Sequence, residues 1–240
     1  MYPPNVQKIL SMINDQDLVL DLGAWAQPFP RADYVLDIMP YETRGFLGRV
    51  YEGKERFSKE TWITRDLCDR TPLPFADKFF DFAICSHVLE DVKDPLWVCS
   101  ELQRVAKRGY IETPSRSVEQ SAGVESRNYC GYHHHRWLVD FEDGRLVFTM
   151  KSDLLMFNWR YHLPKRYLRS IPQGARIVQF FWEGRFEFEE KVLLTYQEEA
   201  RYLEEFVLRS AAYSSTRYWM FDAARRIRRN ILSLLNGSKH

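Results

Sequence analysis

The chain has 240 residues, of which 45% are hydrophobic and 28% charged, and its formal net charge is +1. This composition is typical of a globular chain with one domain and additions, and the small net charge does not indicate nucleic-acid binding. No apolar run reaches the roughly 18 residues of a membrane span, and the first residues lack the pattern of a signal peptide. The four cysteines form no CxxC pair, so we expect reduced thiols and a cytoplasmic protein.

The first half of the chain alternates short apolar runs with amphipathic or loop segments. Apolar residues at helical spacing predict a helix over residues 4–14, and the segment 94–109 predicts a second helix that ends at Gly109. Apolar runs predict strands over residues 18–23, 34–38, 61–67, 80–86 and 110–114. Strands separated in this way are typical of a Rossmann-like, doubly wound, mostly parallel α/β sheet.

The second half of the chain has the patterns of hairpins and helices. An Asp-Gly pair at 143–144 predicts a hairpin over residues 135–151, and a further hairpin is predicted over 175–193. Helices are predicted over 152–170 and within 196–235. With the 175–193 hairpin as its last two strands, the sheet has seven strands, and the last hairpin is antiparallel.

Acids, a glycine and a Ser-His pair stand where the predicted strands end. They are Asp21 with Gly23, Asp37, Asp66, and Ser86 with His87. In a doubly wound sheet, ligands bind outside the carboxyl ends of the strands. Successive strands that each end in a polar group therefore predict a binding crevice at this edge. Asp37 also follows Asp21 at about the spacing of an acid that binds ribose hydroxyls.

The turn after the first strand, "GAWAQPFPRA" (23–32), contains a single glycine. A dinucleotide pyrophosphate needs a glycine-rich turn and a helix N-terminus to approach it. No phosphate-binding loop occurs elsewhere, which argues against another nucleotide-dependent enzyme. An adenosine ligand without phosphates does not need such a cradle.

The segments "LVLDLG" (18–23), "VLDI" (35–38) and "LPFADKFFDFAICSHVLEDVKDP" (73–95) resemble class I S-adenosylmethionine-dependent methyltransferases, in particular the type 11 methyltransferase domain. The resemblance covers about residues 17–116 and continues more loosely to 193. It implies S-adenosylmethionine as the cofactor and a methyltransferase domain over residues 1–193. We expect residues 117–151 to be an insert that covers the active site, and 194–240 to be a helical extension.

The resemblance also implies the cofactor-binding residues. In the family, the first acid–glycine turn holds the methionine part, the acid after the second strand binds ribose, and the acid after the third strand binds adenine. Carried over to this sequence, the residues are Asp21, Gly23 and Ala24, then Asp37 and Ile38, then Asp66 and Leu67, with Ser86 and His87 lining the cofactor. The chain departs from the family pattern in its single-glycine turn and in Asp91, which stands where a histidine is often found.

The stretch "GYHHHRW" (131–137) is the most conspicuous polar motif, and three interpretations stay open. In the first, His133, His134 or His135 is a general base, because histidine suits proton transfer near neutral pH. In the second the histidines bind a metal, and in the third they only pack around the start of a hairpin. We predict no metal ligands, because successive residues point in different directions and no acidic pair lies at ligand spacing. Glu112 is a further candidate base, or else the partner of a salt bridge to Arg116.

The expected substrate-binding residues belong to the same stretch or lie shortly before it: Arg116, Tyr132, Arg136 and Trp137. Aromatic, histidine and arginine side chains suit a sugar or sugar phosphate. We therefore expect methyl transfer to an oxygen atom of a small molecule or glycan, a reaction in which the protein mainly aligns nucleophile and methyl group.

The segment 215–236 predicts a basic amphipathic helix, which either touches a membrane surface or packs on the domain. No nucleic-acid partner is expected. The alternative to an enzyme is a methyltransferase-like scaffold that binds a partner or a membrane through this helix. The two interpretations differ on whether the crevice is open or filled by Trp25 and Phe29.

Overall fold

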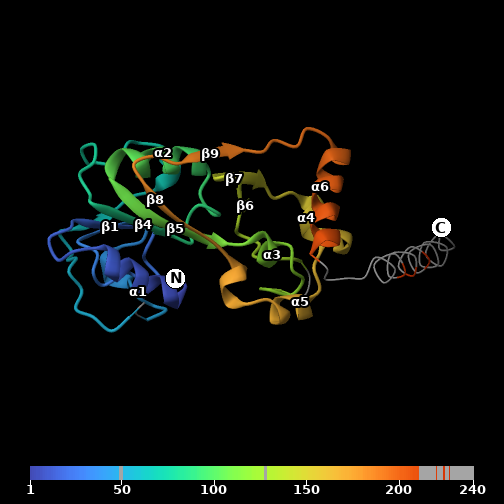
Figure 1. Cartoon of the computed structure of the whole chain (residues 1–240), viewed down its shortest axis with the longest axis horizontal. Coiled ribbons are helices and arrows are strands. Elements are labelled where there is room, and N and C mark those ends of the chain that lie inside the picture. The colour runs from blue at the N-terminus through green and yellow to red at the C-terminus, as the bar shows by residue number, and fades with distance from the viewer. Residues whose placement is uncertain (49–50, 127–128, 211–219, 221–223, 225–226, 228–240) are drawn as a thin grey trace, which may run out of the picture.

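The computed structural model describes residues 1–48, 51–126, 129–210, 220, 224 and 227 (Figure 1). Its centre is a six-stranded sheet of order β3-β2-β1-β4-β5-β8, in which only the last pair is antiparallel. The strands are β1 (Val19–Leu22), β2 (Tyr34–Asp37), β3 (Trp62–Thr64), β4 (Phe82–Ser86), β5 (Arg108–Pro114) and β8 (Ile177–Glu183). The predicted doubly wound, mostly parallel α/β fold is confirmed.

Helices cover both faces of this sheet, as Figure 1 shows for α1 (Pro3–Met12) and α2 (Pro95–Val105). Successive strand residues alternate between the two faces, so Leu20 packs in the α2 cluster and Val19 in the α1 cluster. The Asp94 carboxylate caps α2 by accepting a hydrogen bond from the Trp97 N–H at 3.0 Å. Burial on both faces explains why the strands are continuous apolar runs.

The helix predicted over 94–109 ends earlier than expected, at Val105. Gly109 lies within β5, where an added Cβ would stand 2.3 Å from the carbonyl oxygen of Ala83 on β4. The glycine therefore permits close approach of two strands and does not cap the helix.

A second sheet of order β6-β7-β9 consists of β6 (Trp137–Glu142), β7 (Arg145–Met150) and β9 (Glu187–Glu190). The predicted β6–β7 hairpin is confirmed, and Asp143 and Gly144 at its turn both have positive φ. The hairpin predicted over 175–193 is wrong, because β8 pairs with β5 and β9 pairs with β7. The described central sheet thus has six strands where seven were expected. The sequence of β9, EFEE, has one apolar side chain, which suits a sheet covered on one face only.

Short helices lie in the connections between the two sheets (Figure 1). They are α3 (Arg116–Glu119), α4 (Asp153–Phe157), η3 (Trp159–Tyr161), α5 (Lys165–Ser170) and η4 (Gln173–Arg176). The short helices η1 (Tyr41–Thr43) and η2 (Leu67–Asp69) lie within the central sheet's own connections, β2–β3 and β3–β4. The longest described helix, α6 (Tyr196–Arg209), begins at a capping box of Thr195 and Glu198. Its buried Leu203 packs with Tyr161 and Leu138.

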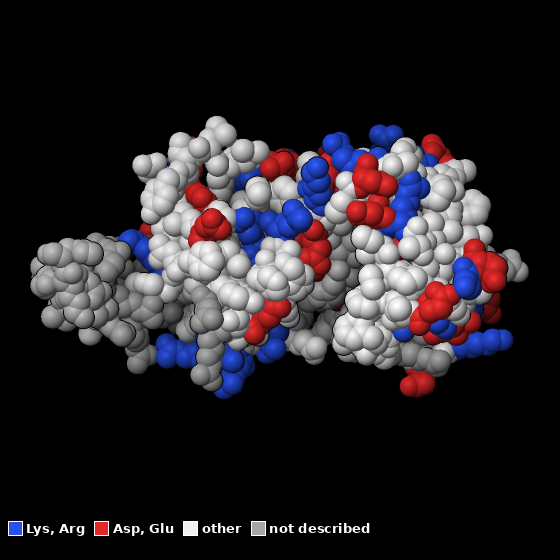
Figure 2. All heavy atoms as spheres, turned by 180° about the vertical axis from the view of Figure 1, so that it is seen from behind, with Lys and Arg blue, Asp and Glu red and all other residues white. Residues whose placement is uncertain are grey.

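The basic helix predicted over 215–236 lies outside the described residues, except for Met220 and Ile227, which are exposed, and Ala224. In the part of the chain that the structure covers, no helix combines the length and the apolar character needed to cross a membrane. Basic and acidic side chains are interspersed over the face shown in Figure 2.

Candidate active site

A cleft of about 240 Å³ lies at the carboxyl ends of β1 to β4. It is lined by residues that the sequence predicted as cofactor ligands, namely Gly23, Asp37, Ile38, Asp66, Leu67 and His87, and by Arg65, Cys68, Val88, Asp91 and Val92. Asp21, Ala24 and Ser86 do not line the cleft. Asp21 and Ala24 are buried, and the Ser86 hydroxyl is buried without a hydrogen-bond partner among the described residues.

The turn after β1 contains no helix, and hydrogen bonds hold it in place. The Gly23 N–H donates to the Leu36 carbonyl at 2.7 Å, the Asp37 carboxylate accepts from the Trp25 N–H at 2.9 Å, and the Asp21 carboxylate accepts from the Phe29 N–H at 2.8 Å. Phe29 is fully buried, and the Trp25 indole donates to Thr43, so neither ring lines the cleft. The crevice is therefore open.

Gly23 is required by both its backbone conformation and its surroundings. Its φ is +72°, and an added Cβ would stand 2.2 Å from Cγ2 of Val88. Only glycine adopts this conformation without strain.

Two acids of the cleft region have perturbed ionisation. Burial raises the pKa of Asp21 to about 7, although the hydrogen bond from Phe29 and the charges nearby act on it as well. Burial also raises the pKa of Asp37, against hydrogen bonds from Met39 and Trp25. Deprotonated Asp21 is a buried negative charge that a cationic ligand would stabilise.

A second, larger cavity of about 470 Å³ shares one residue, His87, with the cleft. Its wall includes Glu112 and Tyr132 from the predicted set, and three basic residues: Lys165, Arg169 and Arg176. The Nε–H of Arg176 is buried and has no hydrogen-bond partner among the described residues. The three basic residues make the cavity suitable for an anion.

His87 has an unusual backbone and a charged environment. Its φ is +59°, and its N–H donates to the Glu112 carbonyl at 2.8 Å. The ring nitrogens lie 3.1 Å from Glu112 and 3.3 Å from Glu90. Burial would lower the pKa of His87, but the two carboxylates outweigh it and raise the pKa to about 9. The ring is therefore a cation at neutral pH and cannot accept a proton from a substrate.

Glu112, a predicted base, is buried and fully engaged. Its carboxylate accepts hydrogen bonds from the Tyr2 N–H at 2.9 and 3.0 Å and from the Tyr110 hydroxyl, and it contacts His87. Burial would raise the pKa of Glu112, but the hydrogen bonds from His87, Tyr110 and Tyr2 lower it. The salt bridge expected with Arg116 is absent from these contacts. A carboxylate with these partners has little capacity left to act as a base.

The histidine stretch separates into exposed and buried parts. His133 and His134 are exposed, whereas His135 is buried, with its Nδ1 2.7 Å from Glu119. None of the three lines the larger cavity, and Tyr132 is the residue of this stretch that does. The role of a histidine as base stays a prediction.

Three predicted substrate-binding residues lie elsewhere. Arg116 is buried, with its guanidinium 3.7 Å from the ring centre of Tyr202, and it anchors α6. Burial lowers the pKa of Arg116. Trp137 is buried and donates to the Val92 carbonyl at 2.9 Å. Arg136 is exposed and lines neither the cleft nor the larger cavity. These side chains serve the start of β6 and the packing of α6, and their role in binding a substrate stays a prediction.

The basic residues of the larger cavity were missed. Lys165 and Arg169 are one helical turn apart on α5, and Arg176 ends η4. The four-residue spacing of Lys165 and Arg169 predicts that both lie on one face of a helix. It does not predict that this face lines a cavity beside His87, because the two residues are far in sequence from the strand ends.

Comparison with known proteins finds a methyltransferase family in one part of the chain. The family model described as a methyltransferase domain matches residues 44–111. A search of curated proteins found no match.

Solved structures that resemble the chain include three methyltransferase-related proteins. One is a chain of the complex between the Haloferax volcanii Trm112 methyltransferase activator and a methyltransferase, with 18% identity, a TM-score of 0.33, and coverage of 48% of this chain and 57% of that one. A SAM-dependent methyltransferase from Aquifex aeolicus has 20% identity, a TM-score of 0.34, and coverage of 48% and 64%. One from Mesorhizobium loti has 17% identity, a TM-score of 0.32, and coverage of 62% and 63%. The chain thus spans less than two thirds of each of these proteins.

The family match covers the second half of the cleft-forming sheet, from the β2–β3 connection into β5. Of the matched strands, β4 pairs with β1, and Gly23 after β1 lines the cleft. The match to a methyltransferase domain over residues 44–111 agrees with the resemblance of the sequence to class I S-adenosylmethionine-dependent methyltransferases.

Proposed function

We propose that this protein transfers the methyl group of S-adenosylmethionine to an oxygen atom of an anionic small molecule or glycan, such as a sugar phosphate. The observation that carries this proposal is that His87 lines both the cofactor cleft and the larger basic cavity. Ligands in the two spaces would meet at this residue. The four cysteines are free thiols, which supports action in the cytoplasm.

The cleft residues fit the cofactor by their chemistry. The Asp37 carboxylate keeps acceptor capacity toward ribose hydroxyls beside its two backbone hydrogen bonds. Ile38 is 59% exposed, and with Leu67 it would give an adenine ring apolar contact. Asp66 also lines the cofactor cleft, where its carboxylate would accept a hydrogen bond from the adenine amino group. The backbone at Gly23 permits close approach of the methionine part.

The larger cavity supports an anionic acceptor. Its volume of about 470 Å³ lies in the range of small-molecule sites. Lys165, Arg169 and Arg176 provide positive charge, and the unpartnered Nε–H of Arg176 is a donor that a phosphate or carboxylate would satisfy. An apolar acceptor would leave the buried Arg176 Nε–H without a partner.

The cofactor supplies an activated methyl group when it is bound. This chain contributes alignment, because methyl transfer is an in-line displacement that depends on the relative position of the two reactants. The His87–Glu112 pair is fixed at the junction of the two spaces by its contacts with Glu90, Tyr110 and Tyr2. A proton of the acceptor hydroxyl must leave, and we propose as its base a histidine of residues 133–135 that does not bind a metal ion.

The proposal is tested first by calorimetric titration of the purified protein with S-adenosylmethionine and with its demethylated product. Asp37→Asn and Asp37→Ala should weaken binding strongly, whereas Asp153→Ala, at an exposed position on α4, should not. Melting temperatures establish that each variant is folded. Absence of binding by the intact protein would refute the proposal and favour the scaffold interpretation.

The acceptor class is tested by transfer of a labelled methyl group to sugar phosphates and to the same sugars without phosphate. Transfer that depends on the phosphate supports the anionic cavity. Transfer only to unphosphorylated sugars or to apolar acceptors would contradict it, while leaving the cofactor assignment intact.

A further inference from the structure

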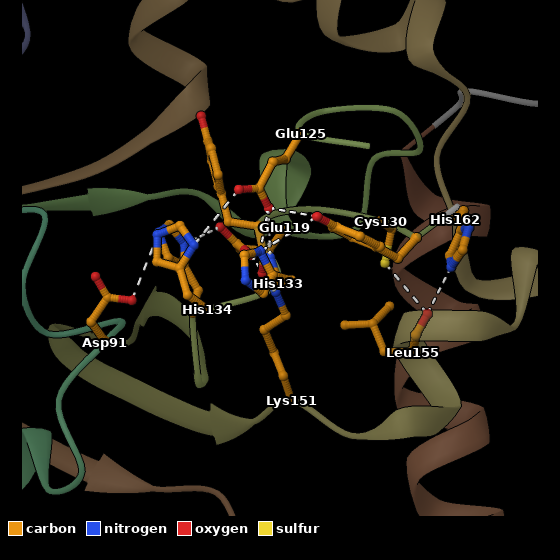
Figure 3. A network of polar contacts seen from close by, with 12 residues as sticks. Asp91, Glu119, Glu125, Cys130, His133, His134, Lys151, Leu155 and His162 are labelled. Carbon is orange, nitrogen blue, oxygen red and sulfur yellow. Dashed lines mark hydrogen bonds and ion pairs between the residues drawn. The ribbon is translucent and has the colours of Figure 1, made fainter. Parts of the chain in front are cut away.

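Asp91, His134 and His135 come together from two distant loops (Figure 3). One potential ligand atom from each of the three lies within 4.8 Å of the other two. The Nε2 atom of His135 is 3.9 Å from Oδ1 of Asp91. The loops are tied to each other because the N–H groups of Arg136 and Trp137 donate to the Glu90 carbonyl at 2.7 and 3.1 Å. Consecutive histidines therefore do reach one place, contrary to the expectation from the sequence.

The ring of His135 is oriented by a buried carboxylate. Its Nδ1 lies 2.7 Å from Oε1 of Glu119, and the other oxygen of Glu119 accepts from the Lys151 ammonium at 2.7 Å. Glu119 and His135 are both more than nine-tenths buried. Glu119 therefore holds the Nδ1 side of the ring, and the Nε2 side faces Asp91. A carboxylate that holds the far nitrogen in this way is typical of histidines that bind metals.

The Asp91 oxygen that faces His135 lacks a partner of its own. Its Oδ1 atom is buried and accepts no hydrogen bond among the described residues. A cation bonded to both atoms at about 2.1 Å fits between this oxygen and Nε2 of His135, which are 3.9 Å apart. A tetrahedral metal ion with bonds of about 2.1 Å would hold its ligand atoms about 3.4 Å apart, which a small side-chain movement achieves.

We propose that Asp91, His134 and His135 bind a first-row divalent cation such as Zn²⁺, Mn²⁺ or Co²⁺. Two imidazole nitrogens and one carboxylate are a common ligand set for such ions and leave further coordination positions open. Asp91 lines the cofactor cleft, and Tyr132, which packs on His135 at 4.5 Å, lines the larger cavity. If the proposed methyl transfer is correct, an open position of the ion would hold the acceptor oxygen and lower the pKa of its hydroxyl. Ion binding itself does not depend on that reaction.

A neighbouring cluster of Glu125, His133 and His134 is the alternative site for a metal ion. All three of its residues are exposed, and Oε2 of Glu125 already accepts from the N–H of His133, its Nδ1 and the Tyr129 hydroxyl. It has neither a buried orienting carboxylate nor a buried oxygen without a partner among the described residues. These differences favour the site at Asp91.

The test is titration of the metal-stripped full chain, purified without a histidine tag, with Co²⁺ followed by visible absorption and with Zn²⁺ followed by calorimetry. Asp91→Asn and His135→Ala should abolish binding, and Glu119→Gln should weaken it by about 10- to 100-fold. His133→Ala is the matched control and should retain the affinity of the unaltered chain. Melting curves recorded without metal establish that the variants are folded.

Two results would overturn the proposal. The first is that the unaltered chain binds neither ion, or that it binds both ions equally well after Asp91→Asn and His135→Ala. The second is that His133→Ala abolishes binding while Asp91→Asn retains it, which assigns the ion to the Glu125 cluster. Titration with S-adenosylmethionine in the presence of a chelator separates these results from a failure of the cofactor assignment.

Discussion

Ionisation of the buried Asp21 carboxyl should lower the unfolding free energy between acid and neutral pH. The substitution Asp21→Asn should remove this loss. Asp21 is 3% exposed, and burial raises its pKa from 3.8 to about 7. The folded protein therefore binds this proton more tightly than the unfolded chain does. The associated stability is fully present below about pH 4 and is lost as the pH rises through about 7.

The magnitude follows from the pKa shift. A change from 3.8 to about 7 corresponds to roughly 4 kcal/mol of unfolding free energy. Asparagine has nearly the same shape, and its side-chain oxygen can accept the hydrogen bond from the Phe29 N–H, but it cannot ionise. Its buried NH₂ group adds a cost of about 1–3 kcal/mol that does not vary with pH. The difference between variant and unaltered protein should thus change by about 2–4 kcal/mol in favour of the variant between about pH 4 and pH 8.

The assay is urea denaturation followed by tryptophan fluorescence, at several pH values and without cofactor. Asp81→Asn is the control, because the hydrogen bond from Lys107 lowers the pKa of Asp81, so its effect should be constant above about pH 5. A stability difference between Asp21→Asn and the unaltered protein that stays the same at about pH 5 and pH 8 would refute the reasoning.

Three further substitutions test other parts of the site. Gly23→Ala should destabilise the fold by about 2–5 kcal/mol, because φ is +72° and the new methyl group meets Val88. In urea denaturation, the additional substitution Val88→Ala should recover only the part that is due to the steric clash. Full recovery of the unfolding free energy would contradict the argument from φ. The charged His87 ring should stabilise the fold below about pH 6.5, and this contribution should be lost as the pH rises to about 9. His87→Gln should remove it, at a cost of about 1 kcal/mol of unfolding free energy after discounting for the 43% exposure of the side chain. An unfolding free energy whose pH dependence is unchanged in that range would exclude this role. Arg176→Gln should raise the KM for an anionic acceptor about 10-fold or more while the Kd for S-adenosylmethionine stays constant; an unchanged KM would place the anion elsewhere.

The central sheet and its cleft were predictable from the sequence because their causes are local. Strands buried on both faces are continuous apolar runs, and parallel strands bring their carboxyl ends to one edge. Asp37 and Asp66 follow such strands directly, so their place in the cleft could be read from the sequence.

The second cavity and the second sheet depend on contacts between distant segments. Arg176 reaches the cavity because β8 pairs antiparallel with β5, and β9 pairs with β7 of the other sheet. The pattern of residues 175–193 fits a hairpin equally well. Charged and aromatic residues near a site can bind a substrate or pack in the structure, and the sequence alone does not separate the two roles. Arg116 and Trp137 were predicted to bind a substrate before their burial was known.

The glycine-poor turn leads to a last prediction about ligand discrimination. Its backbone is held by Asp21 and Asp37 in place of a helix N-terminus, which suits a ligand without phosphates. Asp21 adjoins the Gly23 turn, and its pKa of about 7 makes its charge variable near neutral pH. A sulfonium cation favours the ionised carboxylate, whereas the demethylated product carries no such charge. S-adenosylmethionine should therefore gain affinity relative to the product as the pH rises from about 6 to 8, by up to about 10-fold per pH unit. Calorimetry of both ligands over this range measures the ratio, and the gain should disappear in Asp21→Asn. Parallel pH profiles of the two ligands in the unaltered protein would show that Asp21 does not sense the charge of the ligand.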